Sequence, residues 1–173
     1  MVWHNGPDNE WTISLLNIGS DEQILEIGFG PGAAIASLVK LYPSVQVVGI
    51  DHSEAMFAAA SSRNRGAIVA GHVNLELGSV ENLPFTNSTV DKAFSINSIY
   101  FWEEPLQGLR ELYRVLKRGG RLAITVRDKN REAYQAFRPE KLKQMLNQAG
   151  FVNVEIASNS VPTHPLICVV GTK

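Results

Sequence analysis

A glycine-rich turn and one acidic residue in the first third of the chain have the types and spacing of a nucleotide-binding site. Gly28, Gly30 and Gly32 lie close together, and Asp51 directly follows a mostly apolar run at residues 45–50. Glycines let the backbone adopt positive φ angles and approach a ligand without an intervening Cβ. A carboxylate at a strand tip can accept hydrogen bonds from both hydroxyls of a ribose. This combination predicts a ligand that contains adenosine.

The elements that must position these residues can be read from the pattern around them. An apolar run at residues 23–27 enters the glycine turn, and apolar residues then recur at helical spacing until Pro43. A second apolar run leads into Asp51. This order of strand, turn, helix and strand is typical of a right-handed βαβ unit that binds a nucleotide.

The identity of the cofactor depends on neighbouring residues. Gly28, Gly30 and Ala33 also satisfy the fingerprint of dinucleotide-binding proteins, so an NAD(P)-binding Rossmann oxidoreductase is one alternative. Glu26 argues against it, because this residue points to the same side of the strand as Gly28, where an apolar residue would be expected. Pro31 also argues against it, since it removes an N–H group that would otherwise bind a pyrophosphate.

The remainder of the chain alternates between strand and helix patterns. The expected later strands are residues 73–77, 89–96, 121–126, 151–156 and 166–170, and the expected helices begin near Asp8, Ser53, Pro105 and Pro139. Gly6 and Pro7 should keep the N-terminal residues in a loop, and Gly119 with Gly120 should end the third of these helices. The last two strands have no helix between them, so they should be antiparallel neighbours.

Four segments together resemble the class I S-adenosylmethionine-dependent methyltransferases, in particular the small type 11-like domain. They are residues 25–32 (LEIGFGPG), 48–53 (VGIDHS), 82–85 (NLPF) and 114–122 (RVLKRGGRL). The resemblance covers nearly the whole chain. It implies an α/β fold, a Rossmann-like doubly wound seven-stranded mixed sheet with a C-terminal antiparallel strand pair. It also implies one domain over residues 1–173, in which an N-terminal segment and helix at 1–22 precede a cofactor-binding core at 23–173.

The resemblance implies S-adenosylmethionine as the cofactor and assigns roles to individual residues. Asp51 would accept the ribose hydroxyls, Glu26 would hold the glycine loop, and Asn97 would lie near the methionine amino group. His52 and Met56 would flank the adenine. The full set expected at the cofactor is Glu26, Gly28, Phe29, Gly30, Gly32, Asp51, His52, Ser79, Val80 and Asn97.

One position departs from the family pattern. The family often has Asp where this chain has Ser79, and that Asp accepts a hydrogen bond from the adenine amino group. A serine hydroxyl can still accept, but it is neutral and shorter, so the change should cost about 1 kcal/mol. Cofactor binding is expected to survive. A catalytically silent, regulatory cofactor-binding protein is therefore a further alternative.

The methyl acceptor is expected to be a small molecule of unidentified structure. Tyr100 and Trp102 follow the fourth strand, where the family contacts its substrates, and with His4 they are expected to line the acceptor pocket. Phe101 is expected to pack in the core. The sequence shows no convincing general base and no carboxylate cluster suited to magnesium, so no metal is expected.

Composition and charge restrict the functional classes and locations to which the protein can belong. The 173 residues carry a net charge of −1, which gives no basic surface typical of a nucleic-acid-binding protein. No apolar stretch reaches membrane-spanning length, and residues 1–22 lack the pattern of a signal peptide. The single cysteine, Cys168, fits a reducing compartment, so a cytoplasmic location is expected. The oligomeric state cannot be read from these features.

Overall fold

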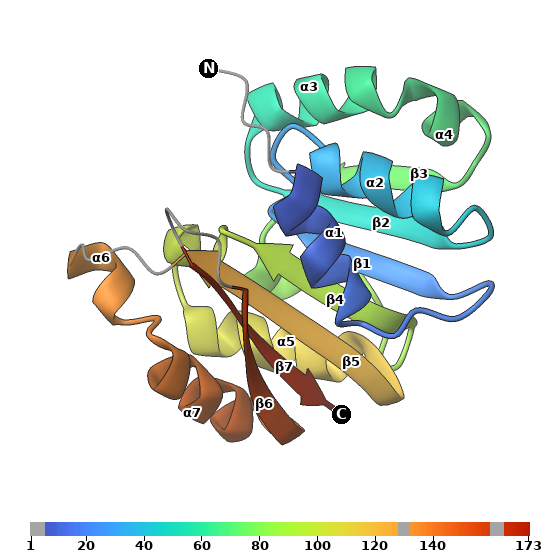
Figure 1. Ribbon diagram of the computed structural model, residues 1–173. Helices are drawn as coiled ribbons and strands as arrows, with labels where there is room; N and C mark the ends of the chain where they lie inside the picture. Colours follow the sequence, from blue (N-terminus) through green and yellow to red (C-terminus); the bar gives the residue numbers. More distant parts are fainter. Residues whose placement is uncertain (1–5, 128–131, 160–164) are drawn as a thin grey trace.

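A seven-stranded mixed sheet forms the centre of the computed structural model, which describes residues 6–127, 132–159 and 165–173 (Figure 1). The strand order is β3-β2-β1-β4-β5-β7-β6. The strands are β1 (Gln23–Ile27), β2 (Gln46–Asp51), β3 (Val73–Leu77), β4 (Val90–Ile96), β5 (Leu116–Arg127), β6 (Val152–Asn159) and β7 (Leu166–Thr172). Strands β1 to β5 pair in parallel, whereas β7 is antiparallel to both β5 and β6. The predicted mixed sheet and its closing antiparallel pair are confirmed.

Helices cover both faces of the sheet (Figure 1). They are α1 (Gly6–Ser14), α2 (Ala33–Leu41), α3 (Glu54–Arg63), α4 (Arg65–Val69), α5 (Pro105–Val115), α6 (Glu132–Gln135) and α7 (Pro139–Ala149), with short 3-10 turns η1 (Val80–Asn82) and η2 (Ile99–Phe101). Leu112 of α5 and Leu146 of α7 belong to one apolar cluster. Ile13 of α1 and Leu38 of α2 belong to the cluster on the other face. Burial of these two faces holds the sheet rigidly between them.

Two predicted boundaries are wrong. Helix α1 begins at Gly6 rather than after the Gly-Pro pair, because proline is accommodated in the first turn of a helix, where its missing N–H is not needed. Gly119 and Gly120 do not end α5, which stops at Val115. They form an irregularity within β5, where Gly119 has φ +78° and a Cβ on Gly120 would lie 2.8 Å from the Lys117 carbonyl oxygen.

The topology places the carboxyl ends of four strands at one edge of the sheet. Strands β3, β2, β1 and β4 are consecutive neighbours and parallel, so their carboxyl ends all lie on this side. The glycine turn leaves β1, and its first residue, Gly28, donates its N–H to the carbonyl of Ile50 in β2 at 2.7 Å. Asn97 leaves β4 with φ +55°. Ligands of open α/β sheets bind at such an edge.

Candidate cofactor site

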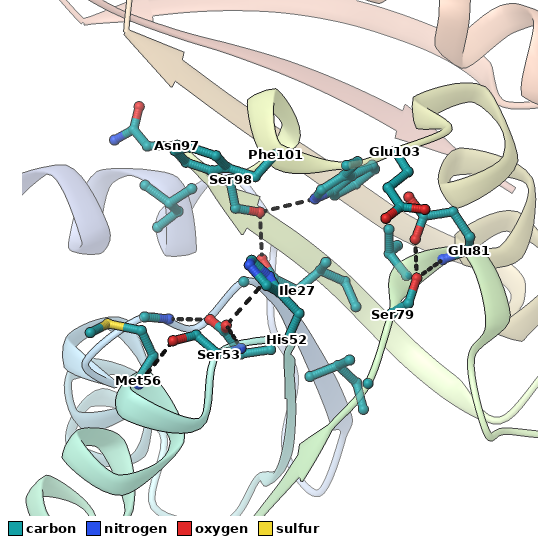
Figure 2. A pocket seen from close by; sticks show the side chains of 18 residues that line it. Ile27, His52, Ser53, Met56, Ser79, Glu81, Asn97, Ser98, Phe101 and Glu103 are labelled. Atoms are coloured by element: carbon teal, nitrogen blue, oxygen red, sulfur yellow. Dashed lines mark hydrogen bonds and ion pairs between the residues drawn. The ribbon is translucent and has the colours of Figure 1, made fainter.

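A cleft of about 600 Å³ lies at this edge of the sheet (Figure 2). Four neighbouring strands contribute to it through the residues that follow them, and α3 and η2 complete its walls. The lining includes Gly28, Gly30, Asp51, His52, Ser53, Met56, Ser79, Val80, Glu81, Asn97, Ser98, Phe101, Trp102 and Glu103. Seven of the ten residues expected at the cofactor from sequence line this cleft: Gly28, Gly30, Asp51, His52, Ser79, Val80 and Asn97.

Asp51 connects two segments of the cleft wall. Its carboxylate is buried, with only 6% of the residue exposed. One oxygen, Oδ2, accepts the N–H of Gly30 at 2.8 Å, and the other, Oδ1, accepts the N–H of Ser53 at 2.9 Å. Each carboxylate oxygen has two acceptor sites, so one on each remains available. Asp51 therefore fixes the glycine turn against the start of α3 while it retains the capacity to accept two hydroxyl groups.

Gly28 is a position where only glycine fits. Its φ is +71°, and a Cβ there would collide with the side chain of Ser98. Ser98 is held in place because its Oγ donates to the Ile27 carbonyl at 3.1 Å and lies 2.7 Å from Ser95 Oγ. The indole N–H of Trp102 donates to the same Oγ at 3.2 Å. Figure 2 shows Ser98 with its hydrogen bond to Ile27. This hydroxyl links the turns after β1 and β4.

Two residues of the glycine turn that were expected at the cofactor, Phe29 and Gly32, lie outside the cleft lining. The Phe29 side chain is 3% exposed and packs in the core cluster of α1 and α2. Gly49 makes room for it, because a Cβ at Gly49 would lie 2.7 Å from Phe29 Cδ1. Gly32 has φ +73° at the start of α2, and its carbonyl accepts Asn64 Nδ2 at 3.0 Å. Both residues shape the turn rather than line the cleft.

Glu26 lies beneath the cleft and is 2% exposed. Its Oε2 is buried without a hydrogen-bond partner among the described residues. Burial raises the pKa of this carboxyl well above its usual value, and the nearby charge of Asp51 raises the pKa further. The sequence predicted that Glu26 would hold the glycine loop. The N–H of Gly30 instead bonds to Asp51, so Asp51 does the holding.

The turn after β3 contains a hydroxyl and carboxylate pair that sequence reasoning missed. Ser79 Oγ accepts the N–H of Glu81 at 3.2 Å and donates its own proton to Glu81 Oε2. The other oxygen, Glu81 Oε1, accepts the N–H of Glu104 at 3.2 Å. Although burial, the largest single effect, raises the pKa of Glu81, hydrogen bonds from Ser79 and from backbone N–H groups bring the pKa below its usual value. The sequence signal for this pair was a glutamate, Glu81, two residues after Ser79 in the turn that follows β3.

The aromatic residues after β4 divide differently from the prediction. Phe101, expected in the core, is 71% exposed and lines the cleft, as Trp102 does. Tyr100, expected in the acceptor pocket, lies outside this lining and packs against the core, with its ring centroid 4.3 Å from that of Tyr134. Its hydroxyl accepts the N–H of Arg127 at 3.0 Å, which fixes the ring under the loop. His4 falls outside the described residues.

The residues present fit an adenosyl cofactor. Four strand ends span three strand spacings, about 14 Å, so a ligand with a nucleoside at one end and an amino acid at the other can lie across them. Gly30 leaves open space at the wall, since a Cβ there would have no atom within 4 Å. At the β4 end, Asn97 Oδ1 is buried and has no partner among the described residues, which suits a donor such as an ammonium group.

Comparison with known proteins decides the family. A family model described as a methyltransferase domain matches residues 25–124, more than half of the chain, from β1 into β5. The chain is a class I S-adenosylmethionine-dependent methyltransferase by family. Its cofactor is S-adenosylmethionine, as the sequence predicted, and the oxidoreductase alternative is set aside.

Individual relatives agree with this assignment. An uncharacterized methyltransferase of Bacillus subtilis, YdaC, is 34% identical over all of this chain and 95% of its own length. The ubiquinone/menaquinone biosynthesis C-methyltransferase UbiE of Geobacter sulfurreducens is 32% identical to this chain. The match covers 69% of this chain and 48% of the length of UbiE. A solved structure of a SAM-dependent methyltransferase from Aquifex aeolicus shares the fold, with a TM-score of 0.77 and 23% identity over 95% of this chain and 88% of its own.

Two further features bear on partners. Among residues 6–127, 132–159 and 165–173, no helix has the length and apolar character needed to cross a membrane. In the same residues, no group of three or more His, Cys, Asp or Glu side chains could hold a metal ion.

Proposed function

We propose that this methyltransferase transfers the methyl group of S-adenosylmethionine to a small, uncharged or cationic acceptor at the mouth of the cleft. The observation that carries this proposal is the arrangement of Asp51, whose carboxylate fixes the Gly30 turn and still has two acceptor sites within the cleft. Family membership supplies the reaction class. The acceptor class follows from the charges and aromatic faces of the lining.

The binding roles follow the order of the strands. Asp51 accepts the ribose hydroxyls, Gly28 and Gly30 allow the ligand to approach the backbone, and the N–H and side chain of the turn at Ser79 and Val80 face the adenine. Asn97 offers its unpartnered carbonyl oxygen to the amino group of the methionine part. His52 and Met56, both in the lining, flank the base. Bound S-adenosylmethionine supplies an activated methyl group on a positively charged sulfur.

The charge of the cleft supports the choice of acceptor. Asp51, Glu81 and Glu103 line it, and the described lining includes no Lys or Arg. Such a site favours a cationic cofactor and disfavours an acceptor that carries a carboxylate or phosphate. Phe101 and Trp102 add aromatic faces that can hold an apolar ring or a cation. The name of UbiE, which refers to quinone biosynthesis, is consistent with a small organic acceptor.

The protein contributes position more than proton transfer. Asp51 and Glu81 are committed to hydrogen bonds, and the remaining titratable lining side chains, His52 and Glu103, are exposed. His52 Nδ1 lies 3.8 Å from Asp51 Oδ1, and the His52 side chain is 74% exposed, so nothing holds it as a base. Alignment of the two reactants in a partly dry cleft is the main contribution. Acceptors that need no strong base, such as an amine or a thiol, fit this site best.

A turnover screen tests the proposal. Sets of three acceptors, which share one aromatic ring and carry an amine, a hydroxyl or a carboxylate arm, should each be incubated with the full chain and S-adenosylmethionine. The release of S-adenosylhomocysteine is then measured. We expect turnover with amine or neutral members and little with carboxylates. A preference for the carboxylates would contradict the proposed acceptor class. Cofactor binding without turnover on any acceptor would favour the silent, regulatory alternative.

A further inference from the structure

The hydroxyl of Ser79 has a fixed direction in this structure, and Glu81 fixes it. Ser79 Oγ has one proton and two acceptor sites. The proton is donated to Glu81 Oε2, and one acceptor site takes the N–H of Glu81 at 3.2 Å. Figure 2 shows both contacts at the end of the cleft formed by the turn after β3. One acceptor site remains, so toward a ligand Ser79 can accept a hydrogen bond but cannot donate one.

The Glu81 carboxylate is itself held in the orientation that this arrangement needs. Its second oxygen, Oε1, accepts the N–H of Glu104 at 3.2 Å, just before α5. Glu81 therefore connects the turn after β3 to the loop before α5 through two separate oxygens. Its pKa lies below the usual value, so the group is ionised at neutral pH and cannot donate to Ser79. The negative charge also makes the Ser79 oxygen a better acceptor.

We propose that Glu81 is a specificity-determining residue that keeps Ser79 as an acceptor, so that the cleft selects a purine with a 6-amino group over one with a 6-oxo group. This inference rests on the proposed function, because it places the adenine at the turn after β3. A 6-amino group donates to Ser79, whereas a 6-oxo group would put two acceptors face to face. Glu81 thus supplies the negative charge that a neutral serine lacks at this position.

The substitution E81Q separates this role from a structural one. The glutamine Oε1 can keep the hydrogen bond from the Glu104 N–H, so the loop connection remains. The glutamine Nε2 then faces Ser79 and donates to it, which releases the Ser79 proton to point into the cleft. Ser79 changes from an acceptor to a donor while shape and packing stay nearly the same. Only the preference of the cleft for donors or acceptors should change.

The experiment is a calorimetric titration of the full chain with S-adenosylhomocysteine and with S-inosylhomocysteine, its 6-oxo analogue. The wild type should bind the adenosyl compound about tenfold more tightly, because the 6-amino group donates a hydrogen bond to Ser79, whereas the 6-oxo group and the Ser79 acceptor site form none. In E81Q the ratio of the two dissociation constants should shift toward the inosyl compound by about tenfold or more. In S79A the ratio should fall as well, because the acceptor is gone.

A matched control is E104Q, which removes an equal charge beside the cleft and leaves the Glu104 N–H in place. It should keep the wild-type ratio. An E81Q ratio within about twofold of wild type, or an S79A ratio that stays at the wild-type value, would overturn the inference. Failure of the wild type to bind either thioether is a different result, because it would contradict the proposed function itself. Thermal melting of each variant verifies that it is folded.

Discussion

At the scale of single residues, Asp51 carries the most weight because one side chain serves both the fold of the loop and the ligand. We expect Asp51→Ala to weaken S-adenosylhomocysteine binding by about 2 kcal/mol, roughly thirtyfold, since two hydroxyl groups lose a charged acceptor and the Gly30 turn loses its anchor. Isothermal titration measures this change. The fold should survive, because the strands and their core are unaltered.

Asp91 provides a matched control for Asp51. Its carboxylate also accepts a backbone N–H, that of Gln23 at 2.9 Å, but at the start of β1 rather than at its end. Asp91→Ala should lower the stability of the fold and leave cofactor affinity unchanged. If Asp51→Ala instead lowers stability as Asp91→Ala does and leaves binding intact, Asp51 is only a structural cap.

Glu26 gives a prediction about pH. Its native pKa is raised by burial and by Asp51, so between the unfolded and native pKa values the folded state binds more protons than the unfolded state. The contribution of Glu26 to stability is therefore fully present below the unfolded pKa, about 4.3, and is lost as pH rises toward the native pKa. The Glu26→Gln variant has no ionisable group at this position, so it does not lose stability in this way as pH rises. The unfolding free energy of Glu26→Gln relative to wild type should rise between about pH 5 and pH 8 in urea titrations.

Glu111→Gln serves as the control for that experiment. The Arg114 side chain, which hydrogen-bonds to Glu111, lowers the pKa of Glu111, so this carboxylate is ionised in both states above about pH 5. The stability difference between Glu111→Gln and wild type should be flat over the same range. A flat difference for Glu26→Gln as well would mean that Glu26 is ionised in the folded protein and has a partner that the described contacts lack.

At the scale of elements, the glycine turn after β1 and the segment after β4 form one unit. Ser98 occupies the space that any side chain at position 28 would need, whereas position 30 is open. Gly30→Ala should therefore lower the free energy of unfolding only by the strain of a positive φ, about 1 kcal/mol. Gly28→Ala should cost clearly more and abolish S-adenosylhomocysteine binding. Chemical denaturation measures the stability of the two variants, which carry the same substitution, and titration measures their binding. Equal losses of stability would contradict the proposed packing.

The exposed ring of Phe101 tests the acceptor wall. Because Phe101 is 71% exposed, Phe101→Ala should change stability and S-adenosylhomocysteine affinity by no more than about 0.5 kcal/mol. It should raise the KM for the acceptor that a screen identifies. Val69→Ala, at a side chain 81% exposed on α4 and outside the cleft lining, should change neither property. An unchanged KM in Phe101→Ala would remove the ring from the acceptor pocket.

Sequence patterns were sufficient for most elements because burial periods and caps are local signals. Ser53 was expected to cap α3, and its Oγ does accept the N–H of Met56 at 3.3 Å. The Gly119 and Gly120 pair was misread because the same two glycines can end a helix or relieve a strand irregularity. Only the pairing of β5 with its neighbours distinguishes the two.

At the scale of the whole molecule, site residues that belong to a sequence motif could be predicted. The positions of side chains that depend on packing between distant segments could not. Gly28 and Asp51 were found from spacing alone. The side on which Phe29 lies depends on the space left by Gly49, and the orientation of Tyr100 depends on its contacts with Arg127 and Tyr134. Such long-range contacts leave no local trace in a sequence. A cytoplasmic location, the absence of nucleic-acid partners and the single-domain boundaries 1–173 stay predictions.

One titration tests most directly whether the cleft binds an adenosyl thioether. The purified full chain should bind S-adenosylhomocysteine with a dissociation constant in the micromolar range, about −7 to −8 kcal/mol. Its melting temperature should rise with the concentration of that ligand, because the ligand binds only the folded state. NADH at the same concentrations should produce neither effect. Tight binding of NADH without binding of S-adenosylhomocysteine would contradict the assignment of the cofactor and of the cleft.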